Sequence, residues 1–195
     1  MTGTYKEYSY LINLLAESNI ELLEDVEKVI DSFPKGVDDF IHRQWITNAI
    51  DCGSLESVKW VLSKDVDLSF RDDEGYTPIL SAIERDLPDK YEIIQLLIDC
   101  GAPINKKGIN DWTPLHMAAA REDLEALRIL VKNAAALTIR TEIDDYATPL
   151  EEAIILKKQK SAEYLQSMDT ILFHARLVEH QIIIEEDNFE ESAIT

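Results

Sequence analysis

Three segments of the chain begin with the dipeptide Thr-Pro, at Thr77, Thr113 and Thr148, and a weaker copy of the same pattern begins at Gln44. A threonine side chain can cap the amino end of a helix, and proline suits the first helical position because the N–H that it lacks has no partner there. The four starts lie 33, 36 and 35 residues apart. A period of this length is typical of a protein that stacks copies of one supersecondary unit, and it constrains the fold more than any other feature.

The clearest copy, which starts at Thr113, predicts two short helices. Its apolar residues form a narrow face on the first helix and a wider stripe on the second, with a polar break at residues 121–123 between them. These residues are Leu115, Ala118 and Ala119, then Leu124, Leu127, Leu130 and Val131. Neither helix alone can bury its apolar face, so the unit requires neighbours on both sides.

The motif Thr-Pro-Leu-His-Met-Ala at residues 113–118, together with the period, resembles the ankyrin repeat. The resemblance implies an all-α solenoid of stacked helix–turn–helix units, with short β-hairpin-like loops between them. It covers about residues 42–166 and implies four repeats, at about 42–71, 72–107, 108–142 and 143–166. Extra residues around 86–90 and 142–145 fall in loops, where insertions leave the stacked faces intact.

Both ends of the chain differ from the repeats, and we expect a single elongated domain over residues 1–195. Residues 1–41 predict an amino-terminal capping pair of helices, the first over residues 5–16. Ser18 to Glu21 matches a capping box that would open the second helix, and Pro34 with Gly36 would end it. At the other end, residues 167–184 predict a carboxyl-terminal cap, and the acidic residues 185–195 predict a disordered tail.

Glycine departs from the repeat pattern at two kinds of position, in the loop between the two helices and at the end of the second helix. Gly101 ends the second helix of its unit, but Asp65 and Ala134 occupy the equivalent positions. A left-handed backbone at the end of a helix suits glycine and is tolerated by aspartate, whereas it costs alanine roughly 1 kcal/mol. We therefore expect a local distortion at Ala134.

The sequence contains no glycine-rich phosphate loop, no H-E-x-x-H or G-x-S-x-G motif and no cluster of metal ligands. His116 belongs to the Thr-Pro-Leu-His turn, where the resemblance implies a structural hydrogen bond. Cys52 and Cys100 form neither a C-x-x-C pair nor a disulfide framework, so we interpret them as reduced structural thiols. The prediction is a protein that is not an enzyme and that uses no cofactor or metal.

Acidic residues number 38 against 19 basic ones, which gives a net charge of -19. Nucleic acids and anionic membranes are bound by Lys and Arg, so this balance argues against both as partners. The chain has no run approaching 18 apolar residues and no signal-peptide pattern at its start, so we expect a cytoplasmic protein that is a monomer when free. Two interpretations of the acidity remain open: it confers solubility alone, or it recognises a partner protein with a basic surface.

The resemblance also implies which residues bind a partner, because ankyrin repeats bind proteins through the tips of their loops and the exposed faces of their inner helices. The matching positions are Asp73, Glu74, Tyr76, Glu84, Arg85, Ile109, Asn110, Trp112, Arg121, Asp145 and Tyr146. Aromatic residues in consecutive loops, surrounded by polar groups, are typical of the core of an interface. The alternative is that each aromatic side chain packs on the neighbouring loop.

Two functions of the protein-binding class follow. The small size, single domain and acidity resemble ankyrin-type immunity proteins encoded beside bacterial toxins, which implies an inhibitor that binds and blocks a basic toxin or effector. The alternative is a scaffold or assembly partner that joins proteins without inhibiting them.

Overall fold

The computed structural model of the chain describes residues 4–38, 40–143 and 146–171. The helices are α1 (Tyr5–Ala16), α2 (Ile20–Glu27), α3 (Trp45–Cys52), α4 (Leu55–Leu62), α5 (Pro78–Glu84), α6 (Lys90–Asp99), the short 3₁₀ helix η1 (Ile109–Asp111), α7 (Pro114–Arg121), α8 (Leu124–Lys132) and α9 (Pro149–Ile155). Residues 159–171 are also helical, and this helix runs across the boundary that the sequence suggested at residue 166.

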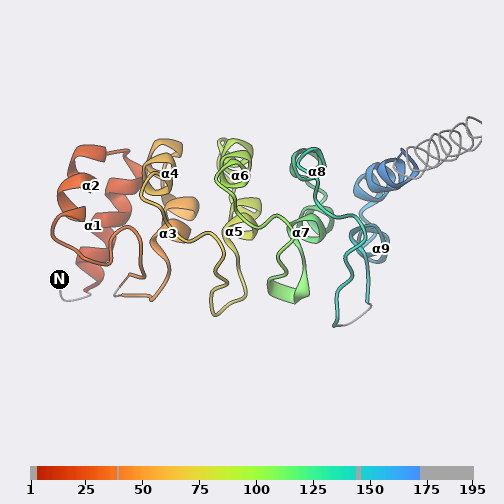
Figure 1. Cartoon of the computed structure of the whole chain (residues 1–195), viewed down its shortest axis with the longest axis horizontal. Coiled ribbons are helices and arrows are strands. Elements are labelled where there is room, and N and C mark those ends of the chain that lie inside the picture. The colour runs from red at the N-terminus through yellow and green to blue at the C-terminus, as the bar shows by residue number, and fades with distance from the viewer. Residues whose placement is uncertain (1–3, 39, 144–145, 172–195) are drawn as a thin grey trace, which may run out of the picture.

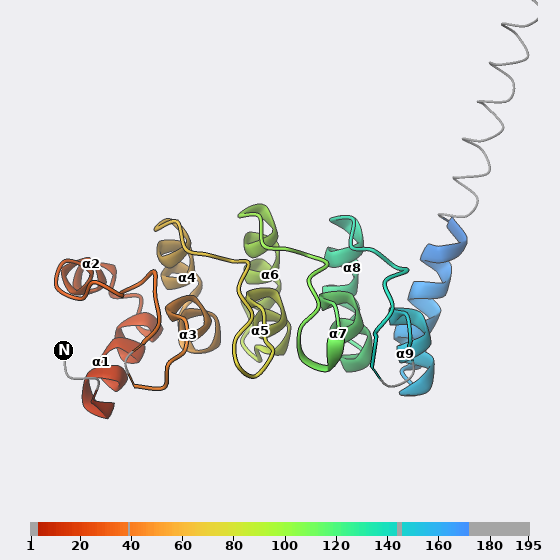
Figure 2. The same cartoon turned by 60° about the horizontal axis from the view of Figure 1, so that its bottom comes forward.

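The helices stand in two rows, and loops project beyond the inner row (Figure 1). In the inner row α1 packs on α3, α3 on α5, α5 on α7 and α7 on α9, while in the outer row α4 packs on α6 and α6 on α8. No strand occurs among the described residues, so the predicted all-α solenoid is confirmed. The view in Figure 2 shows the same order of helix pairs from another side.

The Thr-Pro signals start helices as predicted. Thr77, Thr113 and Thr148 are N-caps whose side chains accept hydrogen bonds from backbone N–H groups in the first turn, and a proline follows each of them. Gln44 makes no side-chain capping bond, which agrees with its weaker signal. These local interactions set where each inner helix begins.

The inner row is close-packed because every inner helix of the repeat-like segments carries an alanine at the same position. The four residues are Ala49, Ala82, Ala118 and Ala153, and each is fully buried. A side chain without a Cγ atom lets neighbouring helices approach closely, and a larger side chain here would overpack the stack.

The amino-terminal helices differ from the prediction in their caps. The N-cap of α2 is Asn19, whose side chain accepts a hydrogen bond from the backbone N–H of Leu22, and not Ser18. Ser18 has a left-handed backbone with φ 58°, and its hydroxyl bonds Ser54 Oγ at 2.6 Å. Because an N-cap needs a non-helical, typically extended backbone, the cap moves one residue along. The helix also ends at Glu27, several residues before Pro34.

The expected distortion at Ala134 is wrong. Ala134 has φ 62°, in the same left-handed region as Gly101 at φ 86° and Asp65 at φ 57°. Its N–H donates to the carbonyl of Val131, and the next N–H donates to Leu130, at 3.0 and 2.9 Å. These are the hydrogen bonds that Gly101 and Ala102 make at the end of α6, so tertiary context holds alanine in a conformation that it disfavours.

Replacing Ala134 by glycine should therefore stabilise the chain by about 0.5–1 kcal/mol, because glycine adopts this backbone without the penalty that a Cβ atom imposes. The midpoint of urea denaturation measures the change. Ala136→Gly is the matched control, because Ala136 is not among the residues with positive φ and should lose stability instead. A lower midpoint for Ala134→Gly would contradict the argument.

Three loops precede α5, α7 and α9, and we name them the first, second and third hairpin loops: residues 72–76, 108–112 and 141–147, the last described without 144 and 145. One backbone hydrogen bond closes each, from Asp72 to Tyr76, Gly108 to Trp112 and Thr141 to Ala147, at 3.0, 2.8 and 3.0 Å. A Cβ atom on Gly108 would lie 2.5 Å from the carbonyl oxygen of Gly75, so glycine at this position lets the first two loops touch.

Candidate functional site

The three hairpin loops and the carboxyl-terminal ends of α5, α7 and α9 share one surface, which we name the hairpin face. Two contacts join loop to helix across it. The Tyr76 hydroxyl of the first loop hydrogen-bonds Glu84 at the end of α5, and side chains of the second and third loops line a groove with those of α9. The fold also brings two predicted site residues from different repeats together, because the guanidinium of Arg121 lies 3.5 Å from the carboxylate of Glu84.

The first hairpin loop presents free acidic charge. Asp73 and Glu74 are exposed and form no salt bridge with any residue of the described part of the chain. Tyr76 is half-buried against the core, and burial together with its hydrogen bond to Glu84 raises the pKa of its phenol to about 12. Its side chain therefore packs in part on the protein itself, which favours the alternative that the loop aromatics have a structural role.

Glu84 continues this acidic region toward α7. It is exposed, and its carboxylate lies 3.5 Å from the guanidinium of Arg121, which also lies 4.0 Å from Asp86. One arginine is thus shared by two exposed carboxylates. The group keeps a net negative charge, and the predicted residue Arg121 serves mainly as their counter-ion.

Arg85 does not lie on the hairpin face. Only 4% of the residue is exposed, and its guanidinium donates to the carbonyls of Ile50 and Gly53, at the end of α3, and to both carboxylate oxygens of Asp89. The loop between α5 and α6 supplies Asp89, and the repeated stacking places the end of α3 beside it. Arg85 therefore joins two neighbouring helix pairs and is not available to a partner.

The second hairpin loop contributes both a turn and an aromatic residue. Asn110 is exposed at the tip with φ 54°, and Ile109 and Trp112 are half-buried. The loop is tied to the third loop by Lys107, whose ammonium lies 2.9 Å from Asp111 and 3.0 Å from Glu142. The half-buried Trp112 is therefore held on a braced loop.

The third loop presents the most exposed of the three aromatic residues. Tyr146 is 60% exposed, and its ring centroid lies 5.5 Å from the guanidinium carbon of Arg140, which pairs with Glu151 at 2.6 Å. The predicted residue Asp145 lies outside the described residues.

A groove of about 600 Å³, which the sequence did not predict, lies between the last two loops and α9. Its lining includes Asn110, Trp112, Thr141, Ile143, Glu152, Ile155 and Leu156. Ile155 and Leu156 follow Thr148 at the offsets at which Glu84 and Arg85 follow Thr77. The position in the repeat that pointed to Glu84 as a site residue therefore also pointed to Ile155. Ile143 lies in the irregular third loop, so its position in the repeat could not have predicted it.

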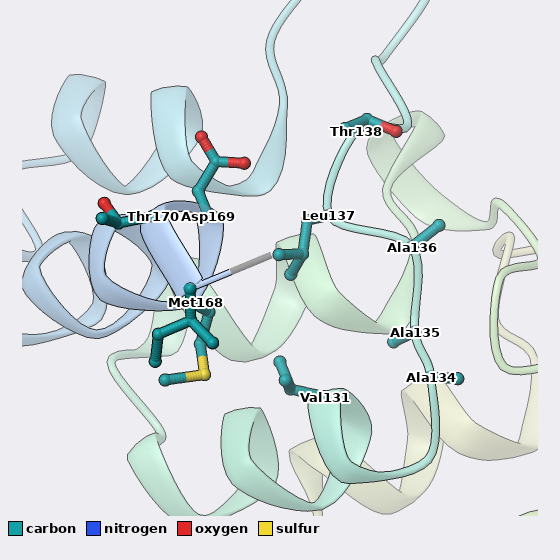
Figure 3. Close-up of a pocket in the computed structure, with 10 residues that line it drawn as sticks. Val131, Ala134, Ala135, Ala136, Leu137, Thr138, Met168, Asp169 and Thr170 are labelled. Carbon is teal, nitrogen blue, oxygen red and sulfur yellow. The ribbon is translucent and has the colours of Figure 1, made fainter. Parts of the chain in front are cut away.

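A second hollow, of about 670 Å³, lies between the end of α8 with the loop after it and the last described helix (Figure 3). Val131 and residues 134–138 form one side of it, and Met168 to Ile171 form the other. Its lining is mostly alanine and aliphatic side chains with one carboxylate, Asp169. The chain beyond Ile171 falls outside the described residues, as do the rest of the predicted cap and the acidic tail.

His116 has a structural role. It is fully buried; the backbone N–H of Thr113 donates to its Nδ1 at 3.2 Å, and its Nε2 lies 3.0 Å from the carbonyl oxygen of Ala147. An N–H group can only donate and a carbonyl can only accept, so the ring is the neutral tautomer with its proton on Nε2. It joins α7 to the loop before α9, and burial lowers its pKa.

The stability of the chain should fall as the pH drops below about 6.5, the ordinary pKa of histidine. Below this pH His116 binds a proton in the unfolded chain, whereas the buried ring in the folded chain stays neutral until its lowered pKa is reached. The loss is at most about 1.4 kcal/mol per pH unit and ends at the lowered pKa of the folded state. In His116→Gln the amide can keep both hydrogen bonds without titrating. Urea denaturation across this pH range should show a weaker dependence for the variant; an equal slope would contradict the assignment.

The other candidate reactive groups of the described residues are the possible metal ligands and the two cysteines. No group of three or more His, Cys, Asp or Glu residues among them is arranged to hold a metal. Cys52 and Cys100 are free, as predicted, but both are exposed and so contribute little to the core. The described part of the chain also has no helix that is both long and apolar enough to cross a membrane.

Comparisons with known proteins agree with this architecture. The family model for ankyrin repeats in three copies matches residues 88–174. Mouse RelA-associated inhibitor is 34% identical over 100 residues, which cover 51% of this chain and 12% of that protein. Mouse protein phosphatase 1 regulatory subunit 12A is 30% identical over 130 residues, 67% of this chain and 11% of that protein.

A bacterial relative gives the same result: the putative ankyrin repeat protein YahD of Escherichia coli is 35% identical over 79 residues, 40% of this chain and 38% of that protein. The chain thus spans a minor part of the length of each of these relatives. Ankyrin repeats are protein–protein interaction modules, and this family together with regulatory relatives points to a non-enzymatic role. The stacked helix pairs, the capped Thr-Pro starts and the matching family model identify the chain as an ankyrin-repeat protein.

Proposed function

We propose that the chain is an acidic inhibitor that binds and blocks a basic protein partner through the hairpin face. The observation that carries the proposal is the exposed, unpaired charge of Asp73 and Glu74 beside the two carboxylates that share Arg121. A surface with more acidic than basic groups speeds encounter with a basic protein and disfavours acidic competitors.

The rest of the chain supports the same proposal. The net charge of -19 adds a long-range field of the same sign, which favours basic partners over nucleic acid or anionic membranes. One relative is named an inhibitor and another a regulatory subunit. We infer a cytoplasmic protein that is monomeric when free, and a bacterial toxin or effector as the class of partner to try first.

The test is the kinetics of binding to a partner obtained by co-purification, measured at two salt concentrations. Asp73→Asn with Glu74→Gln should slow association and flatten its dependence on salt, because exposed charges are screened beyond about 10 Å at 0.1 M salt. The matched control is Glu24→Gln with Glu92→Gln, which removes the same charge from exposed sites on α2 and α6. Equal effects of the two pairs would overturn the proposal that the hairpin face binds.

A scaffold is the second candidate, favoured by the hollow of Figure 3, because a second surface could hold a second protein. The two functions differ in what happens to the partner. An inhibitor abolishes the partner's own activity when it saturates the partner, whereas a scaffold leaves that activity intact and forms a complex of three proteins.

A further inference from the structure

The hairpin face changes character along the stack. At the end of α5 the exposed residues include the acidic Glu84 and Asp86 as well as Leu87, and at the end of α9 they include Ile154, Ile155 and Leu156. The end of α7, between them, carries the one arginine that those carboxylates share. The carboxylates therefore gather at the α5 end of the face, and exposed aliphatic side chains gather at its α9 end, where Glu152 also lines the groove.

The α9 end of the face is a groove in which aliphatic side chains are exposed among polar ones. Ile143, Ile155 and Leu156 are 49%, 46% and 40% exposed, and they line the groove with Trp112. The groove of about 600 Å³ has room for a large aliphatic or aromatic side chain. Asn110 and Glu152 add a polar rim, as at the edge of a binding site for a peptide side chain.

We infer that the hairpin face binds one extended segment of the partner, which places an apolar side chain in this groove and its basic residues on the carboxylates of the first hairpin loop and α5. The inference rests on the proposed function and adds to it the chemistry and the order of the recognised segment. Charge complementarity selects the basic residues, and the aliphatic side chains of the adjoining groove select the anchor.

The geometry also sets a spacing. The acidic region belongs to α5 and the groove to α9, which are separated by two helix spacings, or roughly 16–20 Å. An extended chain covers this distance in about five or six residues. The segment should therefore carry its basic residues about five or six positions from a leucine- or phenylalanine-like side chain, in either direction.

Synthetic peptides test this inference directly on the full chain. One peptide carries paired Lys and Arg residues alone, two carry the same charges with a leucine at the stated spacing on either side, and a fourth carries the leucine next to the charges. Fluorescence anisotropy gives the Kd of each. A correctly spaced leucine should tighten binding about ten- to hundredfold, as burial of one aliphatic side chain predicts.

The chain offers a matched pair of variants for the same assay. Ile155→Ser should abolish most of the gain from leucine, whereas Ile154→Ser should leave it. Both isoleucines belong to α9 and are exposed, but only Ile155 lines the groove. Ile154 lies at the position that the next repeat buries in the earlier units, where Ile50 and Ile83 are fully buried, and no residue of the described part of the chain buries it in the same way.

The outcomes separate the two proposals. If the carboxylate variants weaken peptide binding but leucine adds nothing, or Ile155→Ser behaves like Ile154→Ser, the groove is not the anchor site and only this inference fails. If no peptide binds, both this inference and the acidic recognition surface fail. If Ile155→Ser lowers the denaturation midpoint much more than Ile154→Ser, the chain itself covers the groove, which also overturns the inference.

Discussion

Replacing Arg85 by alanine is expected to destabilise the chain by about 3–5 kcal/mol, the cost of removing one partner from a buried ion pair. The guanidinium donates to the Gly53 carbonyl at 2.7 Å and, from Nε and Nη2, to the two carboxylate oxygens of Asp89 at 2.8 Å each. It also donates to the carbonyl of Ile50. Its loss leaves a partly buried carboxylate and two carbonyls at the end of α3 without this donor.

The denaturation midpoint in urea measures this effect, and Arg71→Ala is the control, because Arg71 is exposed and the change in charge is the same. Arg85→Lys should recover only part of the stability, since one ammonium group cannot reach a carboxylate and two carbonyls in the planar arrangement of a guanidinium. If Arg85→Ala and Arg71→Ala had the same stability, the contacts of Arg85 between neighbouring helix pairs would contribute nothing to the free energy of unfolding.

The ion pair between Arg85 and Asp89 also makes the stability of the fold depend on pH. The hydrogen bonds from Arg85 hold the pKa of Asp89 below its ordinary value of 3.8. The stability that this shift confers is present above pH 3.8 and is lost as the pH falls through the lower pKa of the folded state. The Arg85→Ala variant should lack this part of its acid sensitivity.

Replacing Trp112 by alanine should weaken partner binding by about 2–4 kcal/mol, the range for a central aromatic anchor, and most of the loss should be faster dissociation. Trp112 lines the groove on a loop that Lys107 braces against the third loop. The measurement is dissociation of the complex by surface plasmon resonance. A wild-type dissociation rate would place the interface elsewhere.

Two controls make this result specific. Trp112 also packs on the core, so the denaturation midpoint must show that Trp112→Ala stays folded under the assay conditions. Trp112→Phe keeps an aromatic ring on the loop and should retain much of the affinity. Tyr146→Ala should cost less than Trp112→Ala, because Tyr146 is 60% exposed and is not part of the groove lining.

Local signals in the sequence determined the fold. The caps at Thr77, Thr113 and Thr148 and the helical spacing of apolar residues involve neighbours within one or two turns, so they can be read without knowing the tertiary structure. The alanine that recurs in the inner helices, at Ala49, Ala82, Ala118 and Ala153, can be recognised in the sequence for the same reason, because it lies at a fixed distance from each helix start.

The candidate site was determined only in part. The sequence placed Asp73, Glu74 and Trp112 on loops at the right positions, since loop position follows from the period. It could not show that Arg85 turns inward, because the partners that hold it include the carbonyls of Ile50 and Gly53 in the preceding helix pair. It also gave no reason to join Ile143 to Ile155, which line the same groove from the third loop and from α9.

The sequence by itself thus determined the helix starts, the repeat and the acidity of the chain, because each depends on local propensity or on composition. The tertiary structure alone decided which charges remain unpaired and where apolar side chains form a groove, because those depend on contacts between residues in different repeats. It also decided the backbone of Ala134, where two hydrogen bonds at the end of α8 outweigh the preference of alanine.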